Sequence, residues 1–404
     1  MNRFKNTILI SAGISSIIGL PTQAQEKASL PVGTFELTPT LNVSLQKDSN
    51  VARTNTNKID SWISVINPQV TLGKEIGENS IVFGVNATKG IYHSSDTDDY
   101  DDYQIFANGK FEFDRRNRIS GSFVHLSGHD GRGTVYSVGA GELQSGPDTF
   151  TTKTLDANYS YGALTANANV EIDARWRDID YDLDILPTNP NRLRDRKEKT
   201  IGSTFYYGVS PTVDLLFQGS YLVTDYTDSI ANSASFDSKT KSILTGARWE
   251  TTAATSGFAK LGYQKREFDN ASRSGFSGLK WEAGLAWNPI ERSVIEFSTA
   301  SDTQETNGQG NYIRRIDYNA DWRHEWLDRL TSIAAIGYSD DSYEGGTTPR
   351  NDKTKEYRVG AEYQFRRWAK IITSVSYFDK NSDSTNTDFS YNRTLLSISA
   401  QISL

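Results

Sequence analysis

The segment Tyr391–Leu404 alternates between two kinds of side chain. Leu396, Ile398 and Ala400 have one parity, whereas serines and a glutamine occupy the positions between them. Successive side chains of a β-strand point to opposite faces, so this segment predicts a strand with one apolar and one polar face. Such a strand fits a boundary between an apolar phase and water.

Similar segments recur in pairs along the chain, beginning with Phe35–Leu45 and Trp62–Leu72. Short turns such as Lys74–Asn79 alternate with long polar loops such as Gly128–Thr152 and Asp178–Lys199. Most segments have roughly 9 to 12 residues, which suffices for a tilted strand to cross a bilayer. We therefore predict an all-β fold, a transmembrane antiparallel up-and-down β-barrel of about 18 strands in a bacterial outer membrane, with short turns in the periplasm.

The N-terminus reads as an export signal. Basic residues precede the apolar run Ile8–Leu20, and Thr22–Ala24 provides a small-residue cleavage site. The run is too short for a membrane helix of about 20 residues. The prediction is a signal peptide over residues 1–24 and one outer-membrane barrel over residues 25–404.

Composition agrees with this assignment but does not decide it. The mean hydropathy of -0.55 is that of a soluble protein, as expected when alternate side chains face a wet lumen. The chain has 0 Cys, and a barrel closed by backbone hydrogen bonds needs no disulfides. A net charge of -7 without a dominant basic patch argues against binding of nucleic acid. A soluble solenoid or a secreted sandwich fits the composition almost as well.

Tryptophan placement supports the membrane assignment. All 8 Trp are expected at strand ends, none in the middle of a strand, where they would form two aromatic girdles at the membrane interfaces. The predicted girdle residues are Trp62, Trp176, Trp249, Trp281, Trp287, Trp322, Trp326 and Trp368.

Parity also assigns the polar side chains to the lumen, because an Arg or Lys facing lipid at mid-depth costs about 2–4 kcal/mol. Two interpretations stay open: a lattice of ion pairs that stiffens the wall, or a polar track for a hydroxyl-rich polymer. The predicted pore-lining residues are Asn167, Asn169, Glu171, Asp173, Arg175, Lys280, Glu282, Glu296, Arg315, Asp317, Asp321, Arg323, Arg358 and Glu362.

Other chemical signals are weak. The acidic loop Asp96–Asp102 lacks the glycine and the terminal Glu of an EF-hand, so we interpret it as solvated and predict no metal site and no cofactor. The basic segment Arg192–Lys199 has the charge to meet lipopolysaccharide phosphates, although a solvated loop is the simpler interpretation. His125 and Ser127 share a strand face, but without an orienting partner this spacing does not predict an enzyme.

Three motifs carry a family resemblance: Ala286–Ser293, Tyr363–Trp368 and Asp388–Arg393. With the layout from Gly33 onward, they resemble the family called putative β-barrel porin 2. The resemblance implies a conduit for exopolysaccharide or capsular polysaccharide that partners a periplasmic polysaccharide export protein.

The leading functional hypothesis is therefore passage of a polysaccharide through a hydrated lumen, with outer-membrane lipid and lipopolysaccharide around the barrel. One alternative is a general diffusion porin for small solutes, since loops Gly128–Thr152 and Asp178–Lys199 are long enough to fold inward. Another is a structural surface barrel with a plugged lumen.

Overall fold

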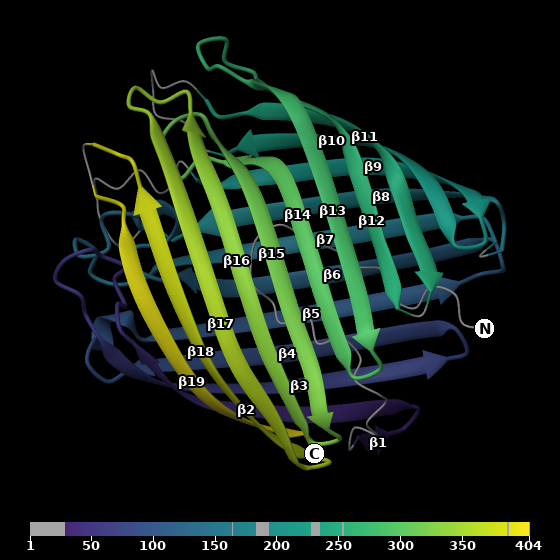
Figure 1. The fold of residues 1–404 in the computed structure, drawn as a ribbon, viewed down its shortest axis with the longest axis horizontal. Helices are drawn as coiled ribbons and strands as arrows, with labels where there is room; N and C mark the ends of the chain where they lie inside the picture. Colours follow the sequence, from purple (N-terminus) through teal and green to yellow (C-terminus); the bar gives the residue numbers. More distant parts are fainter. Residues whose placement is uncertain are drawn as a thin grey trace.

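The protein forms a closed β-barrel (Figure 1). The computed structural model describes residues 29–163, 165–182, 194–227, 235–252, 254–385 and 388–403. Over these residues, 18 long antiparallel strands, β2 to β19, each pair with the next strand along the chain. The last strand, β19, pairs with β2 from Leu395↔Asp48 to Ser403↔Thr40, so the sheet has no free edge.

The strands have 13 to 17 residues each. A short additional strand, β1 (Leu30–Val32), which the sequence analysis did not predict, forms a hairpin with β2. The long strands are β2 (Phe35–Asp48), β3 (Ser61–Ile76), β4 (Asn79–Tyr92), β5 (Tyr100–Glu112), β6 (Asn117–Asp130), β7 (Asp148–Tyr161), β8 (Ala168–Tyr181), β9 (Arg196–Ser210), β10 (Val213–Tyr226), β11 (Ser238–Thr252), β12 (Thr255–Phe268), β13 (Phe276–Ile290), β14 (Ser293–Glu305), β15 (Tyr312–Leu327), β16 (Leu330–Glu344), β17 (Arg350–Arg366), β18 (Ala369–Ser382) and β19 (Tyr391–Ser403).

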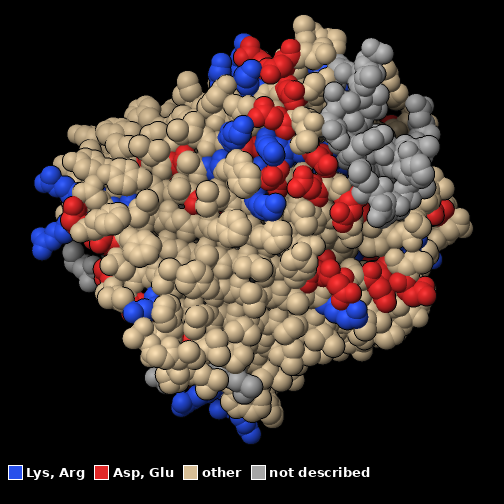
Figure 2. Space-filling model, turned by 180° about the vertical axis from the view of Figure 1, so that it is seen from behind, with Lys and Arg blue, Asp and Glu red and all other residues tan. Residues whose placement is uncertain are grey.

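The outer face of the barrel is apolar. Side chains of one parity on each strand are exposed and mostly aliphatic or aromatic, as in Ile243, which is 73% exposed, and Val359, which is 66% exposed. Figure 2 shows the resulting uncharged band, with Lys, Arg, Asp and Glu gathered toward its margins. Hydrocarbon favours these side chains, and the ladder pairs the backbones of neighbouring strands around the whole barrel, so the strand pattern specifies a membrane-spanning wall.

The strands are longer than the sequence pattern predicts. Apolar alternation ends where outward-facing charges begin, for example at Lys199, whose ammonium lies 3.1 Å from Asp225 of the next strand. The ladder continues beyond these charges, because backbone pairing needs no apolar side chains. Periodicity therefore marks only the part of each strand that lies in lipid.

Short turns and long loops lie at opposite ends of the barrel, as predicted. The tight turns include residues 77–78, 211–212 and 367–368. The long loops contain the short 3-10 helices η1 (Asp96–Asp98) and η2 (Val135–Ser137). Among the described residues, no helix is long and apolar enough to cross a membrane. The predicted signal peptide, residues 1–24, lies outside the described residues.

Candidate functional site: a narrowed mouth inside the barrel

The charged side chains of the wall form cross-strand ion pairs. Arg315 binds Asp341 with two hydrogen bonds of 2.5 Å, and Arg175 donates to Asp156 over 2.5 Å. Other predicted pore-lining residues contact a neighbouring strand: Glu171 with Tyr206, Asp173 with Asn158, Lys280 with Asp302, and Glu282 with Lys260. Lys280 with Glu282 and Arg358 with Glu356 are paired within one strand.

Some of these pairs skip a strand. Arg323 of β15 lies 3.0 Å from Glu362 of β17, with β16 between them. Neighbouring strands are about 4.8 Å apart, so such a contact forms where strand curvature brings side chains together, on the concave inner face. These two residues therefore lie inside the barrel, opposite in parity to the exposed Val359 and Tyr363.

The remaining predicted lining residues lie on the same strands. Asn169 is near the start of β8, Glu296 is on β14 opposite Asp321 of β15, and Asp317 is on β15. Asn167 is different, because β8 begins at Ala168 and Asn167 lies in the preceding turn, where its carbonyl accepts the amide of Gly208 over 2.7 Å. The sequence analysis counted Asn167 as a strand residue, whereas it lies one residue before the strand begins. Whether the other side chains contact a passing solute stays a prediction.

The predicted girdle residues divide into two groups. Trp249, Trp287, Trp322, Trp326 and Trp368 lie at or near the short turns, and Trp62 is the second residue of β3 at the opposite end. Trp176 and Trp281 lie inside strands, which corrects the expectation that none would. These tryptophans lie inside strands because the strands continue beyond the apolar band. Trp176, for example, is paired with Lys199, one of the outward-facing charges, so it lies at the boundary of the apolar band although its strand continues.

The long β6–β7 loop, residues 131–147, folds into the mouth of the barrel. Arg132, which is 6% exposed, makes hydrogen bonds of 2.8 and 2.5 Å to the carboxylate of Asp98 in η1. The backbone at Gly133 has φ +73°, and a Cβ there would lie 2.1 Å from the carbonyl oxygen of Ala52. Glycine thus allows this loop to pack directly on the β2–β3 loop, whose Ala52 is 0% exposed.

The same loop also contacts β8 and β9, the two strands that follow β7 in the wall. The ring of Tyr136 packs edge-on against Tyr181 of β8 at 5.4 Å, and the guanidinium of Arg194 lies 3.5 Å from the Tyr136 ring centre. Arg196 of β9 donates to the Tyr136 hydroxyl over 3.3 Å. Residues 131–147 therefore extend across the lumen from the β2–β3 loop to β8 and β9.

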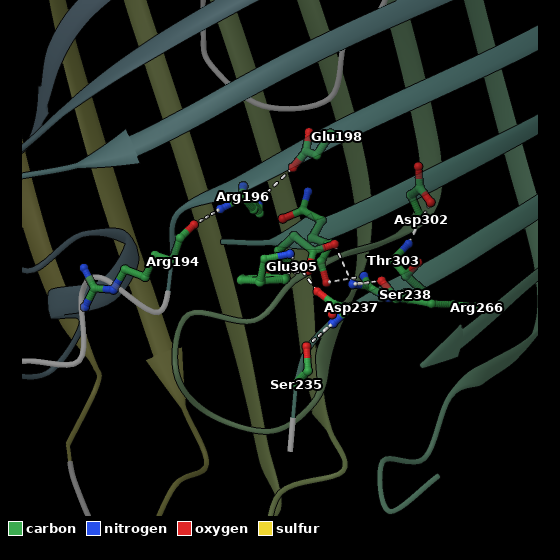
Figure 3. Close-up of polar contacts among 12 residues, drawn as sticks. Arg194, Arg196, Glu198, Ser235, Asp237, Ser238, Arg266, Asp302, Thr303 and Glu305 are labelled. Atoms are coloured by element: carbon green, nitrogen blue, oxygen red, sulfur yellow. Dashed lines mark hydrogen bonds and ion pairs between the residues drawn. The ribbon is translucent and has the colours of Figure 1, made fainter. Parts of the chain in front are cut away.

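A second segment narrows the mouth from the other side. β14 pairs with β13 only as far as Ser301, and the Asp302 carboxylate beyond it accepts a hydrogen bond of 2.6 Å from Gln264 of β12. Glu305 at the end of β14 accepts a hydrogen bond of 2.5 Å from Arg266 (Figure 3). It also accepts one of 2.7 Å from the hydroxyl of Tyr226. The end of β14 therefore inclines into the barrel, toward strands that are not its neighbours.

The loop after β14, residues 306–311, continues this inner layer toward β16 and β17. Asn307 donates to the hydroxyl of Tyr343 over 3.2 Å, and Arg350 donates to the Gln309 amide oxygen over 2.8 Å. Arg350 is also stacked on Phe389 at 3.5 Å. Two inward segments, residues 131–147 and 302–311, therefore occupy the mouth at the long-loop end of the barrel from opposite sides.

Electrostatics differ among the loop arginines. Hydrogen bonds to Asp98 raise the pKa of Arg132, so its charge is firmly held. Burial, together with the charge of Arg393, lowers the pKa of Arg53, which has no ion pair with any carboxylate among the described residues. The mouth thus combines ion-paired arginines such as Arg132 with Arg53, which lacks such a pair in the part of the chain that the structure describes.

The other sequence signals have structural positions but no shared site. Asp98 of the acidic loop is paired with Arg132, and His125 and Ser127 lie on β6 with the parity of the exposed Phe123, which faces outward. Residues 196–199 of the basic segment belong to β9, and residues 192–193 lie outside the described residues. Sequence reasoning did not single out Arg53, because a loop folded back into a barrel leaves no periodic signal.

An antiparallel barrel with an apolar exterior, a polar interior and inward-folded loops defines a porin-like channel of the bacterial outer membrane. The chain belongs to the family described as putative β-barrel porin 2, whose model matches residues 24–402. This match confirms the family suggested by the sequence motifs.

The chain is also similar to solved structures, at low identity. OccK1 (OpdK) of Pseudomonas aeruginosa has a TM-score of 0.50 and 10% identity, covering 91% of this chain and 99% of its own. OpdL of Pseudomonas aeruginosa has a TM-score of 0.49 and 11% identity, covering 92% and 99% respectively. The ferric-catecholate import receptor Fiu of E. coli has a TM-score of 0.44 and 11% identity, covering 90% and 81%. No curated protein matches the chain. Identities this low concern the fold alone.

Proposed function

We propose that this barrel is a channel for small solutes, in which the inward segments 131–147 and 302–311 set the size limit. The observation that carries the proposal is the packing of loop 131–147 across the mouth, from Ala52 to Tyr181. Barrels of 16 to 18 strands leave an aqueous channel, and a loop inside such a channel determines what passes.

The anchoring of the loop favours this function over passage of a polymer. A bulky chain needs loop 131–147 to move away, which breaks the bidentate Arg132–Asp98 pair. Removing one partner of a buried ion pair typically costs about 3–5 kcal/mol, because the other charge stays buried, so this pair holds the loop firmly. The described contacts give no comparable support to the polysaccharide conduit, or to the periplasmic partner, that the family resemblance implies.

The inner wall suits solutes that remain hydrated. Arginines and carboxylates are mixed along the strands and mostly paired, so a solute meets hydrogen-bonding groups without a strong field of one sign. We expect weak ion selectivity along the wall. We also expect outer-membrane lipid and lipopolysaccharide to contact the apolar outer face and its charged margin.

The test is conductance in planar lipid bilayers. In a loop variant, a short Gly–Ser linker replaces residues 131–147; in a control variant, the same linker is inserted between Pro211 and Thr212 in a turn at the other end. We expect the loop variant to show a clearly larger single-channel conductance than the wild type, and the control to match the wild type.

The alternatives give different results. Near-zero conductance in a folded wild-type protein, recovered only in the loop variant, would favour a plugged surface barrel. Equal conductance in all three proteins would mean that the loop does not limit the channel, which contradicts the proposal.

A further inference from the structure

The extracellular mouth contains a cavity of about 560 Å³, a size suited to a small organic ligand. It lies between the β2–β3 loop, the β6–β7 loop and the adjoining ends of β4, β6 and β19. Its charged and polar lining includes Asp48, Arg53, Asp98, Asp130, Arg132 and Arg393.

Two of the three arginines in this cavity are neutralised. Arg132 is paired with Asp98 at 2.5 Å, and Arg393 is paired with Asp48 at 2.7 Å. The guanidinium of Arg53 has one hydrogen-bond acceptor among the described residues, the carbonyl oxygen of Arg132 at 2.9 Å. A carbonyl satisfies one N–H of a guanidinium that carries five, and it supplies no negative charge.

The backbone holds Arg53 in place. Its φ of 51° lies in the left-handed region, which is unusual for a residue other than glycine, asparagine or aspartate. The turn is fixed by Asn50, a residue 0% exposed, whose carbonyl accepts the amide of Arg53 over 3.2 Å and whose side chain bonds Thr54 and Asn392. Backbone strain of this kind persists only where surrounding contacts impose it, so the orientation of Arg53 is built in rather than adventitious.

The chemistry of the cavity selects the charge of its ligand. The Arg53 guanidinium, which has no ion pair among the described residues, can bind one carboxylate, whose two oxygens have the geometry that a guanidinium binds best. Asp48, Asp98 and Asp130 also line the cavity, so its three arginines face three carboxylates, and further negative charge on a ligand is disfavoured. A phosphate or an acidic polymer therefore fits less well than a monoanion.

We propose that this cavity is a binding site for the carboxylate group of a small monocarboxylic acid, with Arg53 as its main ligand-binding residue. The proposal rests on the proposed function, since it names the solute class that the channel would capture at its mouth. Binding itself, however, is measurable without transport.

The experiment is isothermal titration of the purified full-length barrel in detergent micelles with sodium benzoate. Benzyl alcohol serves as the neutral probe and inorganic phosphate as the competing anion. The variants are Arg53→Gln, Arg53→Lys and, as a control, Arg115→Gln in an exposed turn at the other end. The heat-dependent gel shift of outer-membrane barrels checks folding of each protein.

We expect benzoate to bind more tightly than either other probe. Loss of a charged hydrogen-bonding group predicts that Arg53→Gln weakens benzoate binding about tenfold or more, that Arg53→Lys retains part of it, and that Arg115→Gln is unchanged. Unchanged affinity in folded Arg53→Gln, equal affinity for benzyl alcohol, tighter binding of phosphate, or no benzoate binding to the wild type would each overturn the site. If the wild type conducts but does not bind benzoate, the binding site is wrong and the proposed small-solute channel stands. If the wild type binds benzoate but does not conduct, the proposed channel is wrong and the binding site stands.

Discussion

Arginine substitutions should cost much more stability on the outer, lipid-facing side of the wall than on the inner, hydrated side. Val359 is near the middle of β17 and is 66% exposed toward the lipid. An arginine at mid-depth costs about 2–4 kcal/mol, and losing two thirds of the burial of a valine in hydrocarbon adds about 1–2 kcal/mol. We therefore expect Val359→Arg to lower the free energy of unfolding by about 3–6 kcal/mol, which is more than a hundredfold in the equilibrium constant.

The matched control is Ser374→Arg. Ser374 is at the same depth as Val359, because Gly360↔Ser374 and Val359↔Val375 are successive pairs, but it has the opposite parity. On the hydrated inner face its substitution should change stability by about 0.5 kcal/mol or less. Reversible guanidinium unfolding in lipid vesicles, followed by Trp fluorescence, measures both variants. Similar losses for the two variants would refute the assignment of faces.

Three further outcomes are expected. Asp352→Asn should destabilise the barrel by about 3–5 kcal/mol, because Asp352, which is 0% exposed, neutralises both Arg350 and Lys380. The control is Asp225→Asn, which removes an exposed ion pair. If guanidinium unfolding showed a smaller loss of unfolding free energy for Asp352→Asn than for Asp225→Asn, the prediction would be contradicted. Lipids brominated near the head groups should quench Trp fluorescence more than lipids brominated at the chain ends, and the reverse order would disprove the two girdles. Hydrogen bonds from the backbone of Arg116 and the side chain of Asn117 lower the pKa of Asp114. The contribution of Asp114 to turn stability is therefore present above the ordinary pKa of 3.8 and is lost as pH falls through the lowered value. The NMR shift of the Arg116 amide should show this acid transition in the wild type and should not show it in Asp114→Asn.

The barrel could be predicted because its physics is local and repetitive. Alternation in segments such as Tyr391–Leu404 follows from a strand between lipid and water, and a barrel is the closed arrangement of such strands without an edge. The short turns could also be placed to within a few residues: Asn288 and Pro289 interrupt the pattern near the end of β13, where its register with β14 shifts, just before the turn at residues 291–292. Parity then assigned Arg323 and Glu362 to one face, where the structure brings them together.

The mouth could not be predicted in the same way. Arg53 and Arg132 are in loops where no period relates one side chain to the next, and their neighbours Asp98 and Arg393 are distant in sequence. The inclination of β14 after Ser301 likewise depends on tertiary contacts. A cluster of glycines in segment 128–141 was the one available signal, because close packing of a loop on another backbone requires residues without a Cβ.

The central claim, that a narrowed mouth admits small solutes and excludes polymers, is tested most directly by liposome swelling with neutral sugars of increasing size. We expect the wild type to admit monosaccharides quickly and to exclude long oligosaccharides, and the variant lacking loop 131–147 to admit larger sugars. Equal rates for a monosaccharide and a long linear polysaccharide through the wild-type barrel would contradict the account and favour a polymer conduit.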